Sequence, residues 1–249
     1  MKNIAKVFFL TVLMLAACAG AASATPSTQI WIPSTDVQAY KTLHLGIDNY
    51  IRVKRASDGS RWPTAYDVGL TAGVLPFEKL QMEVGIDYIY FGVDAMDNHP
   101  IYFNAKLATP ENSLFKNSPA IAVGGYNFGL ASETNLNLVY GLVAKTIPIV
   151  GRLSAGYYVG NDDLLVDQNG AKAEHGILLS WDRVISEIDD RLWVGVDYQG
   201  GENAFGALNF GASWAFSKNV SVIFGYDIYN RKATGGEQTF TTQVDINFP

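Results

Sequence analysis

The sequence is poor in the residues that build many catalytic and metal sites. It contains one cysteine, Cys18, and only three histidines among 249 residues. Cys18 lies within the export signal described below, so the exported chain is expected to contain neither disulfides nor thiolate metal ligands. No Cys-x-x-Cys-His motif for covalent haem and no His-Glu-x-x-His motif for zinc occurs. We therefore predict no cofactor, no metal site and a fold held together by backbone pairing and burial.

Positive charge is also scarce. The chain has 18 Lys plus Arg against 24 Asp plus Glu, which gives a net charge of −6. Removing residues 1–24, which contain Lys2 and Lys6 but no acidic residue, changes the net charge to −8. Proteins that bind nucleic acid present positive surfaces, so this balance argues against a nucleic-acid partner.

The first 24 residues have the pattern of a secretory signal peptide. Lys2 and Lys6 form a short basic start, residues 7–15 form an apolar core, and residues 22–24 (Ala-Ser-Ala) form a small-residue cleavage site. The apolar core is too short to span a bilayer, which needs about 20 apolar residues. The pattern predicts export and removal of residues 1–24.

A second interpretation of this region stays open. Leu15-Ala16-Ala17-Cys18 resembles a bacterial lipobox, in which Cys18 would carry a lipid and become the first mature residue. We favour cleavage after Ala24, because barrels seldom need a lipid anchor. Residues 25–41 are then an N-terminal periplasmic segment or a plug inside the lumen, and the sequence does not decide between them.

A short pattern of apolar residue, Gly, apolar residue and Asp returns along the chain. Full copies end at Asp48, Asp87, Asp197 and Asp227, and weaker copies occur at Gly125-Tyr126-Asn127 and Gly156-Tyr157-Tyr158. Side chains alternate between the faces of a strand, so Gly and Asp share one face and the apolar residues share the other. The repeat predicts strands with one apolar face and one hydrated face.

Short alternating stretches follow one another from Tyr40 onward, and helical periodicity is absent. We predict about twelve strands, near residues 42–53, 65–75, 79–91, 100–108, 119–129, 136–146, 151–160, 171–182, 191–199, 204–216, 220–230 and 239–248. Each has about the 9–11 residues that a tilted transmembrane strand requires. Connections after even strands include tight turns, while those after odd strands are mostly longer and polar, as in barrels whose short turns face the periplasm. The predicted fold class is all-β, a transmembrane antiparallel up-and-down barrel over residues 42–249.

The last predicted strand strengthens this interpretation. Phe240, Thr242, Val244, Ile246 and Phe248 alternate with polar residues, and Pro249 follows the terminal aromatic. The stretch resembles the C-terminal assembly signal of Gram-negative outer-membrane β-barrel proteins, a class that includes the porins. The resemblance implies an outer-membrane location, contact with outer-membrane lipid and lipopolysaccharide, and insertion by a barrel assembly machinery.

Two soluble folds also produce alternating strands. A secreted β-sandwich or a lipocalin-like barrel would turn the same apolar face inward. Uniform alternation up to Phe248 favours the membrane barrel. Aromatic residues gather near the predicted strand ends, where interfacial girdles are expected, namely Tyr88, Tyr90, Phe91, Trp181, Trp214, Phe216 and Tyr229.

The hydrated face predicts an acidic lumen. Its acidic band consists of the four motif residues Asp48, Asp87, Asp197 and Asp227 together with Glu83, and further inward acids are Asp67, Glu174, Asp182 and Asp245. The opposing basic residues are Arg52, Lys106, Lys145 and Arg152. Rings of carboxylates favour cations. A structural alternative stays open, in which Gly makes room for a neighbour and Asp only keeps a closed lumen hydrated.

The leading functional hypothesis is a narrow porin-like channel for small, preferentially cationic solutes. Twelve strands lie between the filled eight-stranded barrels and the open sixteen-stranded porins. The alternative is a structural or interaction barrel that presents its loops to a partner. An outer-membrane enzyme is least favoured, because alternation points His175 toward lipid while Ser154 and Ser180 point inward.

Overall fold

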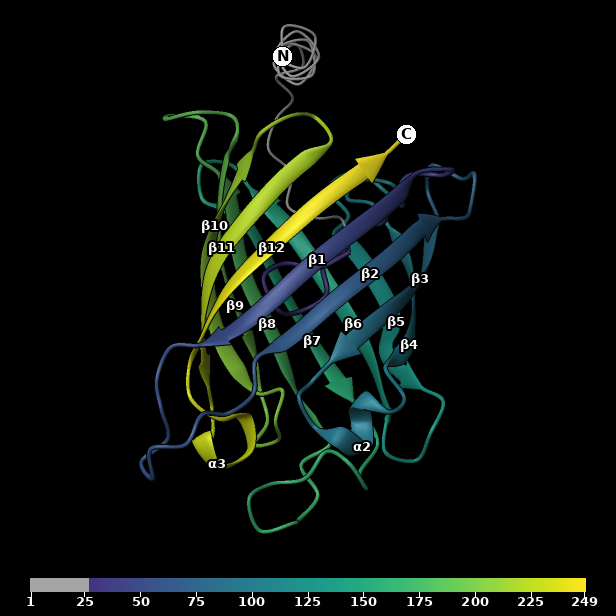
Figure 1. Ribbon diagram of the computed structural model, residues 1–249. Helices are drawn as coiled ribbons and strands as arrows, with labels where there is room; N and C mark the ends of the chain where they lie inside the picture. The colour runs from purple at the N-terminus through teal and green to yellow at the C-terminus, as the bar shows by residue number, and fades with distance from the viewer. Residues whose placement is uncertain (1–26) are drawn as a thin grey trace, which may run out of the picture.

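The computed structural model describes residues 27–249 and contains a closed antiparallel barrel of twelve strands (Figure 1). The strands are β1 (Leu43–Arg52), β2 (Ala65–Gly73), β3 (Gln81–Tyr90), β4 (Ile101–Thr109), β5 (Ala120–Gly129), β6 (Asn135–Ile147), β7 (Gly151–Val159), β8 (His175–Val184), β9 (Leu192–Gln199), β10 (Ala207–Ala215), β11 (Val220–Tyr229) and β12 (Thr239–Phe248). Two four-residue helices, α2 (Asp94–Asp97) and α3 (Lys232–Gly235), lie in the connections. Within residues 27–249 no helix is long and apolar enough to cross a membrane.

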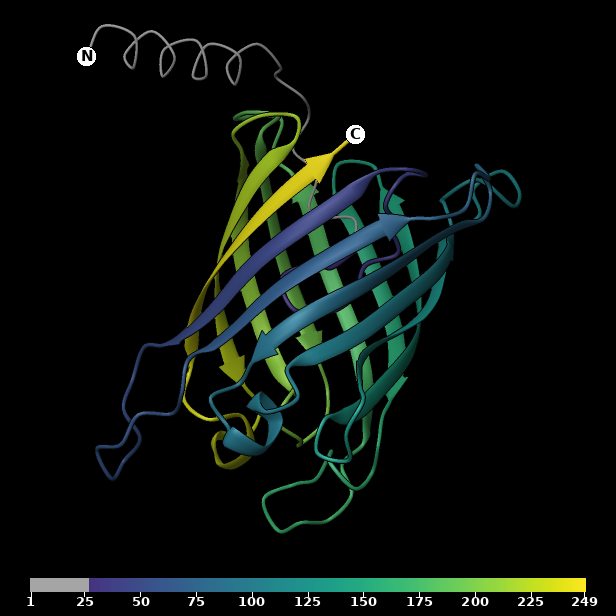
Figure 2. The same cartoon turned by 45° about the vertical axis from the view of Figure 1, so that its right-hand side comes forward.

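The predicted fold class is confirmed. Each strand pairs with its neighbours in sequence, and β12 closes the barrel on β1, from Leu43 opposite Phe248 to Arg52 opposite Thr239. Closure leaves no unpaired strand edge. The strands are tilted against the barrel axis (Figure 2). The predicted signal peptide, residues 1–24, and the lipobox alternative lie outside the described residues.

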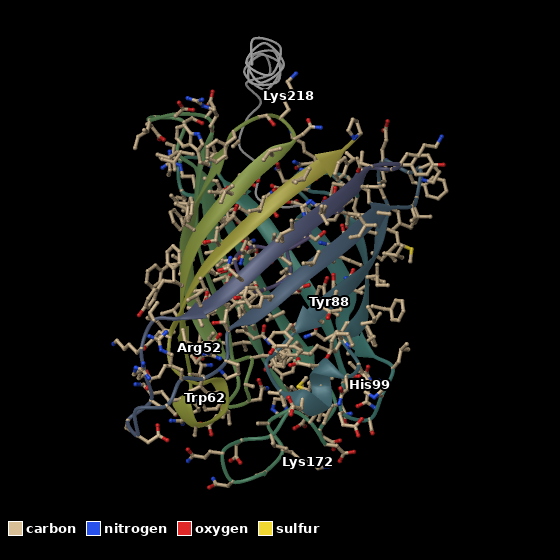
Figure 3. The ribbon with its side chains drawn as sticks, viewed as in Figure 1. Arg52, Trp62, Tyr88, His99, Lys172 and Lys218 are labelled. Carbon is tan, nitrogen blue, oxygen red and sulfur yellow. The ribbon has the colours of Figure 1, made fainter. Side chains whose placement is uncertain are left out.

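Most long connections lie at one end of the barrel and most short ones at the other, with residues 110–119 and 130–134 as the exceptions. In Figure 3 the labelled loop residues Trp62, His99 and Lys172 lie at one end, and Lys218 lies at the other. All six copies of the Gly-containing repeat lie on the odd strands β1 to β11, which run toward the end with Trp62. In an outer-membrane barrel this is the external end.

The main boundary error concerns β8, which was predicted from residue 171 but begins at His175. Residues 171–174 alternate in polarity like a strand. They belong instead to the outer connection, where Val166 pairs with Lys172 and the N–H of Ala173 donates to the carbonyl of Leu165. Glu174, predicted to face the lumen, therefore lies in the outer connection, with a carboxylate oxygen 3.3 Å from His175 Nδ1.

The two faces of the barrel have the inverted polarity expected in a membrane. Large apolar side chains such as Ile47, Ile86 and Phe210 are exposed on the outside, whereas Asn209 and Gln243 are buried inside. The predicted alternation of β12 is confirmed, since Phe240 and Phe248 are exposed outward and Thr241 and Gln243 are buried. Val244 and Ile246 share the outward face with the two phenylalanines. Their role as an assembly signal stays a prediction.

Two aromatic residues expected in the interfacial girdle point inward instead. Tyr229 is 8% exposed because it shares the inward face of β11 with Asp227. Phe91 follows β3 and packs edge-on against the inward Tyr102, with ring centroids 6.0 Å apart. Tyr88 and Tyr90 are exposed on the outer surface as expected.

Candidate functional site: the barrel lumen

Residues 27–39, here called the inner segment, lie inside the barrel. One carboxylate oxygen of Asp197 on β9 accepts hydrogen bonds from the backbone N–H groups of Ile30 (2.8 Å) and Trp31 (3.0 Å). Gln243 on β12 donates to the carbonyl of Ile30 (2.7 Å), and Trp31 Nε1 donates to the carbonyl of Phe205 in the β9–β10 connection (3.0 Å). The inner segment thus reaches from the start of β1 to an outer connection.

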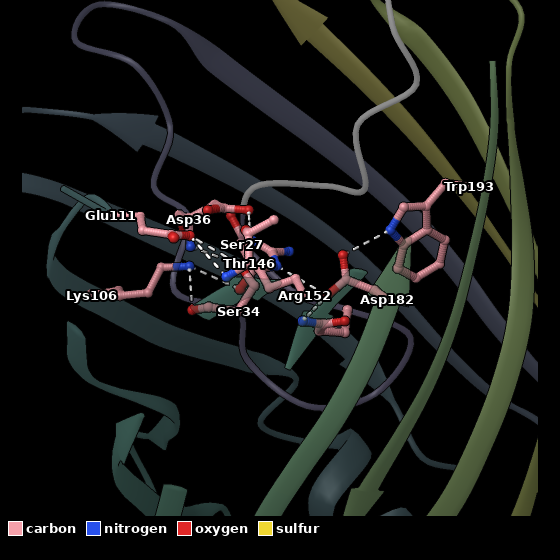
Figure 4. Close-up of polar contacts among 10 residues, drawn as sticks. Ser27, Ser34, Asp36, Lys106, Glu111, Thr146, Arg152, Asp182 and Trp193 are labelled. Atoms are coloured by element: carbon pink, nitrogen blue, oxygen red, sulfur yellow. Dashed lines mark hydrogen bonds and ion pairs between the residues drawn. The ribbon is translucent and has the colours of Figure 1, made fainter. Parts of the chain in front are cut away.

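Lys106 on β4 binds the inner segment at its base (Figure 4). Its ammonium group lies 3.1 Å from a carboxylate oxygen of Glu83 and donates to the carbonyls of Ser27 (2.9 Å) and Ser34 (3.3 Å). Glu83 in turn accepts from the backbone N–H of Gln38 (2.8 Å). Lys106 and Glu83 are both 3% exposed, so this pair is a buried anchor for the inner segment.

Arg152 on β7 forms a second anchor (Figure 4). Its guanidinium group pairs with Asp36 of the inner segment and with Asp182 on β8, the latter at 3.0 Å. Asp182 also accepts hydrogen bonds from Trp193 Nε1 and Gln29 Nε2, each at 3.2 Å. The charges of Arg152 and Asp182 are therefore compensated locally.

Arg52 lies at the outer end of β1 and clamps the β11–β12 connection. Its Nη1 donates to the carbonyls of Gly235 (2.7 Å) and Glu237 (2.5 Å). The guanidinium carbon lies 4.8 Å from the ring centroid of Tyr229, within cation–π range. Arg52 thus binds carbonyls and an aromatic ring, whereas Lys106 and Arg152 are paired with carboxylates.

Lys145, predicted to face the lumen, does not. On β6 the buried side chains are those of Leu142 and Ala144, so the alternation turns Lys145 outward with Val143. Its ammonium group lies 2.6 Å from a carboxylate oxygen of Glu111 in the β4–β5 connection. This pair lies at the short-turn end of the barrel and leaves the lumen with one cation fewer than predicted.

Three carboxylates on neighbouring strands, here called the acidic wall, face a cavity of about 430 Å³ beside the inner segment. Asp48 on β1 lies directly opposite Asp67 on β2, and Asp87 on β3 lies opposite Gly69, two residues along from Asp67. Asp87 accepts a hydrogen bond from Asn104 Nδ2 (2.6 Å). Asp48 and Asp67 have no hydrogen bond or ion pair with any residue from 27 to 249, and Asp67 Oδ1 is buried. The acidic wall thus joins Asp48 and Asp87 of the predicted acidic band to Asp67, one of the further inward acids, and none of the three forms an ion pair with a described residue.

The side of the cavity formed by β6 is apolar, and the sequence did not predict this. Leu136 and Tyr140 on β6 face inward, and Leu138 and Leu142 join them in a buried cluster with Ile32. Phe91, Met96, Leu164 and Phe205 pack against this cluster and line the outer part of the cavity. Residues 138–144 carry no charged or amide side chain on either face of β6, so alternation could not separate the inward face from the outward face.

The structure also shows where the remaining predicted residues lie, and their roles stay predictions. Asp227 accepts from Thr239 Oγ1 (2.6 Å), and Asp245 lies 3.5 Å from His44 Nε2. His175 is exposed and stacks on Tyr157. In the described part of the chain, no three His, Cys, Asp or Glu side chains are placed to hold a metal ion.

The closed barrel, its apolar exterior and its charged interior define an outer-membrane β-barrel with porin-like architecture. Solved structures share this fold. The KdgM porin matches with a TM-score of 0.50 and 9% identity, covering 83% of this chain and 98% of that chain. An outer membrane channel from Pseudomonas putida F1 matches with a TM-score of 0.51 and 13% identity, covering 85% of this chain and 96% of that chain. No protein-family model and no curated protein matches the sequence.

Proposed function

We propose that the protein is a narrow outer-membrane channel that prefers cations and whose solute path follows the acidic wall. The observation that carries this proposal is that the basic residues Lys106 and Arg152 are paired, while two carboxylates of the lumen are not. Lys106 and Arg152 are bound by carboxylates and by the inner segment, while Asp48 and Asp67 face the cavity without partners among the described residues. Arg52 also lines the cavity and binds only carbonyls, but it is one cation against the three carboxylates of the acidic wall, so the net free charge along the path is negative.

The total charge of the lumen supports the same preference. Eight inward strand carboxylates (Asp48, Asp67, Glu83, Asp87, Asp182, Asp197, Asp227 and Asp245) face three inward basic residues (Arg52, Lys106 and Arg152). A cleft of one charge sign with low-dielectric walls concentrates counter-ions. Carboxylate rings produce cation preference in channels of known mechanism.

The inner segment limits the size of the path. It crosses the lumen from its anchors on β3 and β4 to Asp182, Asp197 and Gln243 on β8, β9 and β12. The cavity beside it is lined mainly by residues of β1 to β6. We infer that the inner segment is a resident plug and that only small solutes pass beside it.

The solute is expected to differ from that of one structural neighbour. The KdgM porin has been solved in complex with disordered oligogalacturonate, a saccharide that carries carboxylate groups. The unpaired carboxylates Asp48 and Asp67 would repel such a solute. A cationic solute is attracted by the same two groups.

Planar-bilayer recording of the folded barrel tests the proposal. We expect discrete, small conductance steps in KCl and, in a salt gradient, a reversal potential whose sign shows K⁺ permeating faster than Cl⁻. Different gel mobility of unheated and boiled protein first establishes that the sample is folded. A folded barrel without conductance would reject the channel and favour the alternative of an interaction barrel. A Cl⁻ preference would reject the role of the acidic wall.

A further inference from the structure

Two carboxylates of the acidic wall are opposed in a way that sheets normally avoid. Asp48 and Asp67 are direct partners on neighbouring strands and share the inward face. Directly opposite side chains have Cβ atoms about 4.5–5.5 Å apart, and like charges at such positions destabilise a sheet. Because no described residue supplies a cation to this pair, a bound positive group would relieve the repulsion.

A second set of groups in the same cavity is also unpartnered. Thr71, Asn127 and Tyr140 line the cavity, are 5%, 7% and 8% exposed, and make no side-chain hydrogen bond with any residue from 27 to 249. Buried polar groups are nearly always hydrogen-bonded, to protein, to water or to a ligand. Three such groups around one cavity point to an occupant with polar atoms.

The apolar side of the cavity begins directly beside the carboxylates. Ile89 on β3 lines the cavity and is the register partner of Asp67, and Phe91, which also lines the cavity, follows two residues later. Phe91 packs on Tyr102, and Tyr50, two residues from Asp48, packs edge-on against Trp31 with ring centroids 5.1 Å apart. A charged group at the acidic wall would therefore continue into apolar surroundings.

From this juxtaposition we infer that the cavity is a binding site for an organic primary amine with an apolar body. Its volume of about 430 Å³ lies within the range of small-molecule pockets, about 300–1,000 Å³, which are mostly apolar with a few placed polar groups. An ammonium group has three N–H donors and can bridge the opposed Asp48 and Asp67. The apolar body packs against Phe91, Met96 and Leu164. The inference deepens the proposed channel function, on which its role in solute selection rests.

An alkylammonium series tests both halves of the site. Binding of ethyl-, butyl- and hexylammonium to the folded protein is measured by calorimetry, and block of the K⁺ current is measured in planar bilayers. Burial of each added methylene should tighten binding about fourfold. The neutral alcohols of the same length should bind at least about tenfold more weakly, because they lack the charge-assisted hydrogen bonds. Equal binding of amine and alcohol would overturn the site.

A charge-matched pair of variants locates the site. Asp48→Asn/Asp67→Asn should weaken hexylammonium binding at least about tenfold, since it removes the two bridging carboxylates. Glu202→Gln/Asp189→Asn removes two carboxylates that lie in connections and do not line the cavity, and it should bind like the wild type. Equal affinity of the two double variants would place the amine elsewhere and overturn the inference.

The two readouts separate this site from the channel proposal. Cation-selective conductance without amine binding would leave the channel standing and reject the site. Amine binding that is lost in Asp48→Asn/Asp67→Asn, in a barrel that conducts no ions, would support the site and reject the channel. Affinity that does not rise with alkyl length would show that only the charge is recognised and would reject the apolar half.

Discussion

Two copies of one sequence repeat have different surroundings on different sides of the lumen. Asp197 on β9 is 1% exposed and accepts hydrogen bonds from Ile30, Trp31 and Asn209. Asp48 on β1 occupies the same position of the repeat, yet it faces a cavity and has no such donors. The repeat sets the face of the strand on which the carboxylate lies. The group that the carboxylate meets across the lumen decides its role. Asp197 meets the inner segment and stabilises the fold, whereas Asp48 faces the cavity.

The difference has an energetic cause. A buried carboxylate is stable only when donors or cations replace the water it loses. The inner segment supplies two backbone N–H groups to Asp197, so that side of the lumen is closed and compensated. Asp48 and Asp67 lack such donors, so the acidic wall requires water or a cation in the cavity.

The largest expected effect concerns the buried anchor formed by Lys106 and Glu83, whose charges compensate each other. Lys106→Met should lower the free energy of unfolding by about 3–5 kcal/mol, because it leaves Glu83 buried without its cation. Urea unfolding of the barrel in lipid vesicles measures this change. Adding Glu83→Gln should restore more than half of the loss, since the neutral amide still accepts from Gln38. A double variant as unstable as the single one would show that Lys106 acts mainly through Ser27 and Ser34.

The matched substitutions Asp197→Asn and Asp48→Asn compare the two copies directly. Asp197→Asn should destabilise the barrel by about 2–3 kcal/mol, since an amide cannot accept all three hydrogen bonds of the carboxylate. It should also raise conductance by loosening the inner segment. Asp48→Asn should leave stability unchanged or slightly higher, because it removes repulsion with Asp67. Equal losses in the two variants, measured in the same urea titration, would contradict the distinction between the two sides.

The smallest effect is expected in the β8–β9 connection, outside the lumen. Hydrogen bonds from the Arg191 side chain are the main cause that lowers the pKa of Asp189 from 3.8 to about 2. A lowered pKa stabilises the fold above pH 3.8, and this contribution is lost as the pH falls toward 2. Because the pair is partly exposed to solvent and lies outside the barrel wall, Asp189→Asn should not measurably shift the urea midpoint at pH 7. A clear shift would mean that this connection is coupled to the barrel.

The sequence predicted the faces of the strands but not the relation between strands. Alternation is a local property, so it placed Asp48, Asp67 and Asp197 inward correctly. The opposition of Asp48 and Asp67 depends on the β1–β2 register, which is set by the connection at residues 53–64 and by barrel closure. No periodic signal marks residues 27–39, because an extended segment inside a barrel is bound by contacts from many strands.

The central claim is that the acidic wall sets the cation preference, whereas the other lumen carboxylates hold the structure. The most direct measurement is the reversal potential in a KCl gradient for Asp48→Asn/Asp67→Asn/Asp87→Asn, with Asp189→Asn as a control outside the lumen. We expect the triple variant to lose most of its preference for K⁺, while the control keeps it, because the acidic wall lines the cavity and Asp189 does not. An unchanged K⁺ preference in the triple variant would contradict the account.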